Sequence, residues 1–226
     1  MFRLLTNTTD RQMKKVLLML GVLSAMACGS AFAQVAVGGQ LGLNYQGVED
    51  DSNVNFTLLP GVTYELSNQL AIGGQIGIDY RARTSTQKQG EKSIKTTNSD
   101  FKFLLTPYMR YYALGVDRLS LYFDAQVPLS FGTVGSSTVD GKTTDGNGTF
   151  GIGLQVVPGL KFELSNQIAL LATANVARFG VMYNSVSVKE GDKTVTTSAT
   201  SFGLGVNHAG YGKDAALFMV GFQFSF

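Results

Sequence analysis

Apolar residues recur at every second position along most of this chain, and this alternation limits its fold more than any other feature. From Val35 to Tyr45 one set of alternate residues is apolar or glycine, while the other set is small or polar. A period of two is typical of β-strands, whose successive side chains point to opposite faces. The pattern occurs in eight segments, at 35–46, 55–66, 70–81, 101–112, 119–132, 149–164, 168–183 and 201–226. The sequence therefore predicts an all-β fold.

Two of these segments are irregular. In the seventh segment the alternation slips near Arg178, where a β-bulge would return Phe179 to the apolar face. The last segment is too long for one regular strand, and we expect an interruption between Asn207 and Asp214.

The connections between the segments alternate in length. Short turns are expected at 67–69, 115–118 and 165–167, and long polar loops at 47–53, 84–99, 133–147 and 184–199. Short turns at one end and long loops at the other are typical of outer-membrane barrels. Two hairpins also share a repeat, LPGVTYELSNQLAI at 59–72 and VPGLKFELSNQIAL at 157–170. Similar turn chemistry is a sufficient explanation for this repeat.

The apolar face is too large for the inside of a soluble barrel. Roughly fifty apolar residues lie on it, whereas an eight-stranded barrel has an interior only just wide enough for its own side chains. Aromatic residues also gather at the two ends of the strands, as in the girdles at membrane interfaces. A soluble two-sheet sandwich has no reason to sort its aromatic residues in this way. We therefore predict an eight-stranded antiparallel up-and-down transmembrane β-barrel.

The N-terminal segment has the pattern of a secretory signal peptide. Two lysines precede an apolar run at 16–26, and an A-x-A cleavage site ends at Ala33. The run is much shorter than the roughly 20 residues that a spanning helix needs. We predict a translation start at Met13, a signal peptide within 1–33 and a mature barrel domain at 34–226.

Removal of this segment also limits the chemistry of the mature chain. The basic excess of the full chain lies in the signal segment, so the mature chain is nearly neutral and shows no footprint for nucleic acid. Cys28 is the only cysteine and is removed as well; Ala25, where a lipoprotein signal usually has leucine, argues against lipidation. Neither a disulfide nor a thiol site is expected.

The motifs that resemble catalytic or binding sites are weak. The G-x-G-x-x-G match at 146–151 precedes an alternating strand, whereas a dinucleotide fingerprint needs a helix. His208 is the only histidine, and no serine or acid can be placed beside it. The acidic run at 49–51 could ligate Ca²⁺ but is better explained as a solvated loop. We expect no enzyme activity, no cofactor and no metal.

Five charged residues are predicted to face the lumen: Glu65, Arg110, Asp124, Lys161 and Glu163. Buried charges are tolerated when they are paired, so we expect an ion-pair network that fills the lumen, with Arg110 approached by carboxylates from more than one side. A selectivity ring in a narrow pore is the alternative. Further side chains predicted to point inward at mid-depth are Gln75, Tyr108, Tyr122 and Gln126.

Three motifs carry a resemblance to a known family: TPYMRYY at 106–112, the two ELSNQ hairpins, and the C-terminal GFQFSF. With them, residues 34–226 resemble the small outer-membrane β-barrel domains of Bacteroidetes-type bacteria, which are related in architecture to the OmpX and OmpA barrels. We expect a monomer in contact with outer-membrane lipids and lipopolysaccharide. The resemblance implies that the barrel-assembly machinery reads Gly221, Phe224 and Phe226.

These observations lead to three functional hypotheses. The first is an integral outer-membrane barrel with a plugged lumen, which serves envelope structure or surface interaction through its long loops. The second is a small porin-like channel. The third, a lipid-modifying enzyme, lacks a recognisable set of histidine, acid and nucleophile.

Overall fold

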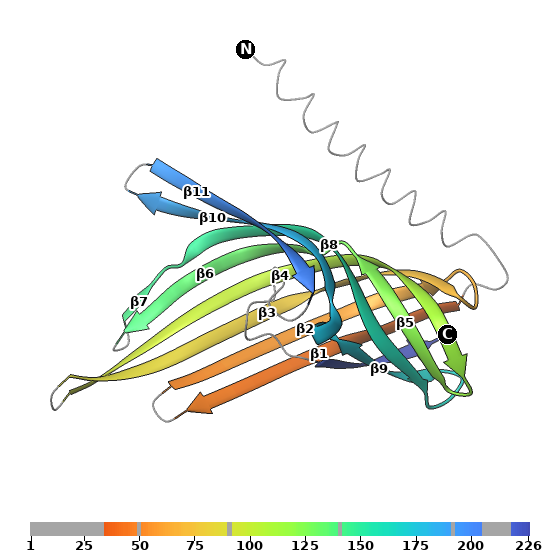
Figure 1. The fold of residues 1–226 in the computed structure, drawn as a ribbon. Coiled ribbons are helices and arrows are strands. Elements are labelled where there is room, and N and C mark those ends of the chain that lie inside the picture. The colour runs from red at the N-terminus through yellow and green to blue at the C-terminus, as the bar shows by residue number, and fades with distance from the viewer. Residues whose placement is uncertain (1–33, 49–50, 90–91, 140–141, 191–192, 205–217) are drawn as a thin grey trace, which may run out of the picture. The chain divides into compact units, whose positions relative to one another are not determined.

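The computed structural model describes residues 34–48, 51–89, 92–139, 142–190, 193–204 and 218–226 (Figure 1). The predicted signal peptide and the expected interruption at 207–214 lie outside these ranges. Nearly all of the described residues lie in antiparallel strands. No helix within the described ranges is long and apolar enough to span a membrane.

The chain passes along the barrel wall eight times, as predicted. The first four passes are single strands: β1 (Gln34–Val48), β2 (Asp51–Glu65), β3 (Leu70–Gln89) and β4 (Lys92–Val116). The last four are each made of two strands: β5 (Leu119–Gln126) with β6 (Leu129–Val139), β7 (Lys142–Thr144) with β8 (Asn147–Glu163), β9 (Ile168–Ala174) with β10 (Phe179–Glu190), and β11 (Lys193–Leu204) with β12 (Phe218–Ser225).

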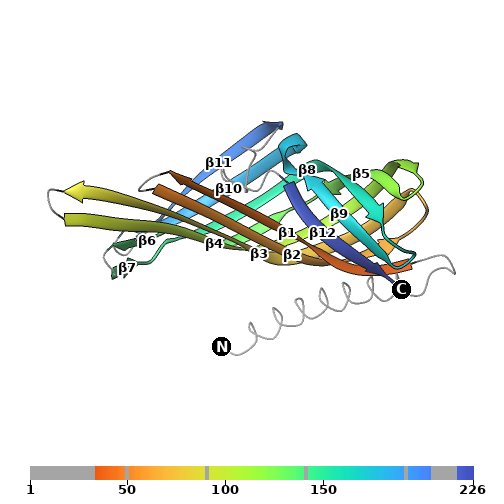
Figure 2. The same cartoon turned by 90° about the horizontal axis from the view of Figure 1, so that it is seen from below.

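The ring closes between the last strand and the first. β12 pairs with β1 in an antiparallel register that runs from Ala36 opposite Ser225 to Leu41 opposite Val220. On its other side β12 pairs with β9, while β11 pairs with β10. Each pass is therefore hydrogen-bonded to its neighbours in chain order, which is the predicted up-and-down topology (Figures 1 and 2).

The irregularity in the seventh pass is at the predicted place but has another form. A single 3₁₀ turn, Asn175–Ala177, separates β9 from β10 where a bulge was expected. The buried Arg178 donates a hydrogen bond from Nη2 to the side-chain oxygen of Asn175, which holds this turn together. Phe179 returns to the outer face, as expected.

The expectation of long loops was wrong for most of their length. The strands continue through 84–89 and 92–99 with unbroken pairing, from Leu70 opposite Tyr111 to Gln89 opposite Lys92. β10 and β11 pair in the same way to the end of their hairpin. These segments have little alternation because neither face is buried, so the sequence pattern could not distinguish them from loops (Figure 2).

The two faces of the barrel wall have opposite chemistry. Large apolar side chains such as Ile76, Phe103 and Leu154 point outward and are exposed. The most buried large side chains are mainly polar or aromatic and point into the lumen, among them Arg110 and Tyr122. An apolar outer belt around a polar interior is the arrangement of a transmembrane barrel.

Candidate functional site

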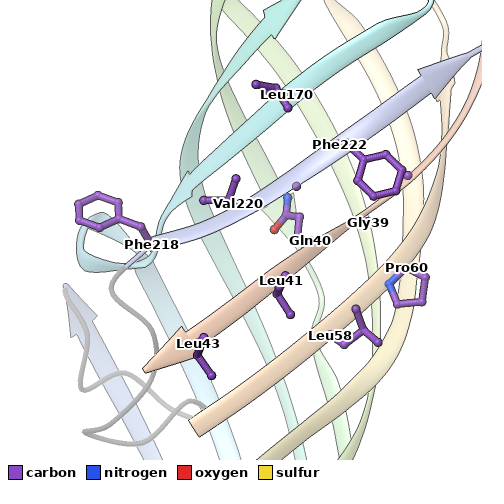
Figure 3. Close-up of a pocket in the computed structure, with 12 residues that line it drawn as sticks. Gly39, Gln40, Leu41, Leu43, Leu58, Pro60, Leu170, Phe218, Val220 and Phe222 are labelled. Carbon is purple, nitrogen blue, oxygen red and sulfur yellow. The ribbon is translucent and has the colours of Figure 1, made fainter. Parts of the chain in front are cut away.

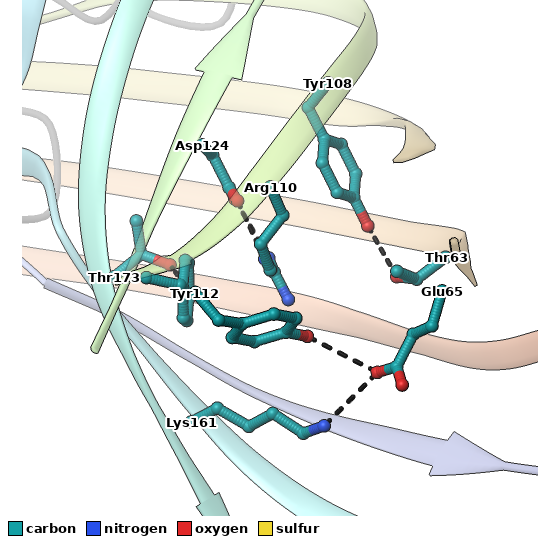
Figure 4. Close-up of polar contacts among 9 residues, drawn as sticks. Thr63, Glu65, Tyr108, Arg110, Tyr112, Asp124, Lys161 and Thr173 are labelled. Atoms are coloured by element: carbon teal, nitrogen blue, oxygen red, sulfur yellow. Dashed lines mark hydrogen bonds and ion pairs between the residues drawn. The ribbon is translucent and has the colours of Figure 1, made fainter. Parts of the chain in front are cut away.

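The structure places all five predicted charged residues in the turn-side half of the lumen, but in two separate groups. Figure 4 labels all of them except Glu163. Arg110 on β4 and Asp124 on β5 form the first group. Lys161 and Glu163 on β8 form the second group with Glu65 at the end of β2.

The first group is a fully buried ion pair. The short turn between β4 and β5 places Arg110 directly opposite Asp124. Arg110 Nε donates to one carboxylate oxygen at 2.7 Å and Nη2 donates to the other at 2.9 Å. Both residues are 1% exposed. This two-bond geometry is the strongest form of an arginine–carboxylate contact and fixes both side chains.

Tyrosine rings enclose the same guanidinium. The Arg110 carbon Cζ lies 3.9 Å from the ring centroid of Tyr122 and 5.3 Å from that of Tyr108. Each ring is also anchored at its hydroxyl, because Tyr108 is hydrogen-bonded to Thr63 at 2.6 Å and Tyr122 to Thr173 at 3.1 Å. Cation–π contact is strongest where water is excluded, as it is here.

Glycines make room for these rings. A side chain at Gly73 would collide with the ring of Tyr108, and a side chain at Gly159 would collide with the ring of Tyr122. Each tyrosine therefore occupies the space above a glycine on a neighbouring strand. The sequence indicated that both tyrosines point inward, but it could not indicate which glycines face them.

Lys161 is the centre of the second group. Its Nζ lies 3.3 Å from Oε1 of Glu65 and 3.1 Å from Oε1 of Glu163. The hydroxyl of Tyr112 donates to the same Glu65 oxygen at 3.4 Å, and the Tyr112 ring lies 5.3 Å from the ammonium. The side chain of Glu65 is 20% exposed and that of Glu163 is 47% exposed, so this group is partly in solvent.

The prediction of Arg110 as a hub of several carboxylates was therefore wrong. Among the described ion pairs Arg110 has one carboxylate partner, and Lys161 is the cation that joins two. Asp124 occupies two donor groups of Arg110, and Tyr122 covers one face of its guanidinium. Glu65 and Glu163 lie instead beside the longer and more flexible ammonium chain of Lys161.

Polar side chains also meet at mid-depth. Gln155 donates to Gln126 at 2.8 Å across neighbouring strands, and both residues are buried. A cavity that Gln75 and Gln223 line beside Arg110 has a volume of about 10 Å³. This is about the smallest space that can hold one water molecule.

The loop-side half of the lumen holds a second polar layer that the sequence analysis did not single out. Asp79 accepts hydrogen bonds from Asn55 at 3.2 Å and Thr57 at 2.7 Å. Arg81 Nη2 lies 3.8 Å from the same carboxylate, and Lys102 stands opposite it in the β3–β4 register. The sequence did contain a sign of this layer, because Asp79 and Arg81 both fall on the polar face of the segment 70–81.

The predicted assembly residues lie on the closing strand. Phe224 and Phe226 form an edge-to-face pair with ring centroids 5.1 Å apart, and Phe226 donates its backbone N–H to Val35 at 3.0 Å. Gly221 faces inward, where a side chain would collide with the backbone oxygen of Gly39. These positions fit a role in barrel closure, and their recognition by an assembly machine stays a prediction.

The motifs set aside in the sequence analysis gain no support. The glycine motif at 146–151 lies within strand β8 except for its first residue, whereas a phosphate loop must lead into a helix. The described ranges contain no group of three or more side chains that could hold a metal ion. His208 and the first two residues of the acidic run at 49–51 lie outside the described residues.

Comparisons with known proteins agree with this architecture. The family described as outer membrane protein beta-barrel domain matches residues 16–208. No curated protein matches the chain.

Similar solved structures include three bacterial proteins. Neisserial surface protein A is 15% identical with a TM-score of 0.35, and the alignment covers 86% of this chain and 96% of that one. A major outer membrane protein of Thermus thermophilus is 15% identical with a TM-score of 0.43, and the alignment covers 86% of this chain and 99% of that one. The translocator domain of the autotransporter NalP from Neisseria meningitidis is 11% identical with a TM-score of 0.38, and the alignment covers 98% of each chain. By the family match, the chain belongs to the outer membrane protein β-barrel domain family and is an outer-membrane protein.

Proposed function

We propose that this protein is a non-conducting barrel with a plugged lumen, which serves envelope structure or surface interaction through the hairpins at its loop end. The observation that carries the proposal is the buried pair of Arg110 and Asp124 between Tyr108 and Tyr122. An ion that crosses the lumen would have to displace side chains that are fixed by several contacts each.

The energetics support a plug. Separation of a buried ion pair leaves two uncompensated charges, and loss of one partner typically costs about 3–5 kcal/mol. The two tyrosines would also lose their contact with the guanidinium and their hydroxyl hydrogen bonds. A conducting state is therefore expected to be rare at equilibrium.

The loop-side hairpins support the surface role. A recess of about 390 Å³ lies on the lumen-facing side of the strand extensions and is lined by polar side chains, including Gln46, Asn53, Arg83 and Asn98. These four residues stand beside one another in the register of β1 to β4. Such a row presents polar side chains on the strand extensions, where a polar partner outside the membrane would meet them.

Planar-bilayer recording tests the plug directly. The wild-type protein should give no sustained openings, whereas the variant with both Tyr108→Ala and Tyr122→Ala should conduct, because it removes the rings that cover Arg110. The single variant Leu154→Ala, on the outer face, is the control and should remain silent. Sustained ion-selective openings of the wild-type protein would overturn the proposal in favour of a small channel.

A further inference from the structure

The outer face of the barrel has an apolar groove over the seam where β12 meets β1 (Figure 3). Its volume is about 690 Å³. Gly39 lies on its floor, and the side chains around it include Leu41, Leu58, Pro60, Phe218, Val220 and Phe222.

The groove exists because one outward position has no side chain. Gly39 stands between Pro60 on β2 and Phe222 on β12 in the cross-strand register. The side chains of these two neighbours point outward on either side of it, so the row has a gap at its centre (Figure 3). In the next row Leu41 stands between Leu58 and Val220, and these three side chains line the same groove.

The repeated hairpin provides an internal comparison. Pro60 and Pro158 occupy the same position of the repeat. The residue opposite Pro158 on the preceding strand is Phe123, whereas the residue opposite Pro60 is Gly39. The same position of the wall is therefore filled by a ring beside one hairpin and left open beside the other.

The chemistry of the groove selects its occupant. Among the described residues that line it, only Gln40 has a polar side chain and none is charged. The groove is part of the apolar belt that contacts the bilayer in a transmembrane barrel, so it continues the protein–lipid interface. Its volume lies within the roughly 300–1,000 Å³ of ligand-sized pockets. A second barrel is a poor occupant, because a convex wall does not enter a gap one residue wide.

We propose that the groove holds one acyl chain of a bilayer lipid, which lies along β1 from Leu43 toward Gly39 and binds more tightly than the lipids around the rest of the belt. The chain gains contacts with the side walls as well as with the floor, whereas a lipid on the convex wall touches one side only. This proposal depends on the barrel and its outer belt and is independent of whether the lumen conducts.

Tryptophan reporters can test the site, because the chain contains no tryptophan. Leu58→Trp places the reporter at the groove. Val156→Trp is the matched control, since Leu58 and Val156 occupy the same position relative to the repeat and are 42% and 41% exposed. Each single-tryptophan barrel is folded in detergent micelles and titrated with phosphatidylcholine whose acyl chains carry bromine, which quenches tryptophan on contact.

The groove reporter should be quenched at a lower lipid concentration than the control. Each additional buried methylene favours binding about fourfold, so the half-quenching concentration for Leu58→Trp should be at least about fourfold lower. Equal titrations of the two reporters would overturn the proposal. A second result would also overturn the proposal: brominated lipid does not quench Leu58→Trp, and chemical cross-linking shows that a second copy of the barrel covers the groove.

Filling the groove should remove this difference. Gly39→Phe in the Leu58→Trp background supplies the side chain that Phe123 supplies in the other hairpin. Its Cβ would lie 3.1 Å from Cα of Pro60 and 3.2 Å from the backbone oxygen of Leu59, so a small shift is required. Folding is checked on a denaturing gel, where a folded barrel migrates differently before and after boiling. If Gly39→Phe does not fold by this heat-shift assay, Val220→Phe is used instead, because it narrows the groove from its exposed wall. Unchanged tight quenching in a folded, filled variant would also overturn the proposal.

Discussion

The two hairpins that share the sequence repeat, β2–β3 and β8–β9, have the same turn but different roles in the lumen. In each turn a serine Oγ accepts the N–H groups of the second and third residues after it, at 3.3 and 3.1 Å for both Ser67 and Ser165. The leucine before each serine also donates to an equivalent carbonyl, at 2.8 Å in the first turn and 2.9 Å in the second.

Above the turns the equivalence ends. Thr63 and Lys161 occupy the same repeat position, yet Thr63 bonds to the Tyr108 hydroxyl while Lys161 joins two carboxylates. Gly159 lies beneath the ring of Tyr122, whereas Gly61 faces the backbone and Gln75 of β3. The turn is determined by residues within it, and the role of each lumen position is determined by what stands across the barrel.

The largest expected effect comes from the ion pair beside the second hairpin. Arg110→Ala leaves Asp124 buried without a partner and removes the cation beneath Tyr122, which typically costs about 3–5 kcal/mol, less where water enters. The heat-shift gel should show unfolding at a clearly lower temperature. Lys95→Ala, an exposed change on the β4 extension, should leave that temperature almost unchanged. Equal stability of the two variants would contradict the buried pairing.

Gly159 has a contact that its counterpart Gly61 lacks, with the ring of Tyr122. Gly159→Ala should lower the free energy of unfolding by about 1–3 kcal/mol, because its methyl group forces the Tyr122 ring out of place. Gly74→Ala is the control, since a Cβ there meets open space. Urea titration in detergent micelles measures both. In the Arg110→Ala background the Gly159→Ala effect should shrink, and full additivity would show that the ring and the guanidinium are not coupled.

Substitutions of the two equivalent carboxylates, Glu65 at the end of β2 and Glu163 at the end of β8, should have smaller effects on stability. Glu65→Gln removes the negative charge beside Lys161 and leaves the Tyr112 hydroxyl only a neutral acceptor, so a loss of about 1–2 kcal/mol is expected. Glu163→Gln, at a largely exposed group, should cost about 0–1 kcal/mol. The same urea titration compares them, and a larger loss for Glu163→Gln would reverse their assigned burial.

The smallest effects should be the turn substitutions, and these should be equal. Ser67→Ala and Ser165→Ala each remove the acceptor of two long, exposed hydrogen bonds, so each should cost about 0.5 kcal/mol. Because the contacts are the same in the two turns, the two losses should agree within measurement error. A clear difference would mean that the turns respond to their surroundings after all.

Features of this structure that depend on residues close together in the sequence could be predicted from it. Alternation predicted the eight passes and the outward apolar face, because side-chain direction follows from strand geometry alone. Arg110 and Asp124 could be placed near one another because only a tight turn separates their strands. The pairing of Lys161 with Glu65 is set by how the sheet closes, across 96 positions of sequence, and no local pattern encodes it.

The strand extensions show the opposite limit. Residues 84–89 and 92–99 are polar on both faces except for Ile94, and polar residues without a buried face are equally common in loops. Their β-structure comes from continuation of the ladder below them. The 3₁₀ turn at 175–177 was located but not identified, since a bulge and a turn interrupt the alternation in the same way.

The β3–β4 hairpin has one further consequence. Each of its 20-residue paired arms is about 65 Å long at ~3.3 Å per residue, and the pairing has no register shift. An apolar band of about 25 Å crossed at a tilt near 40° uses roughly half of that length. In a barrel inserted with its short turns inside the cell envelope, the remainder is a stiff arm above the lipid surface. An antibody or phage that approaches the cell would meet this arm before the bilayer, and a peptide epitope grafted along it would be displayed at a defined height.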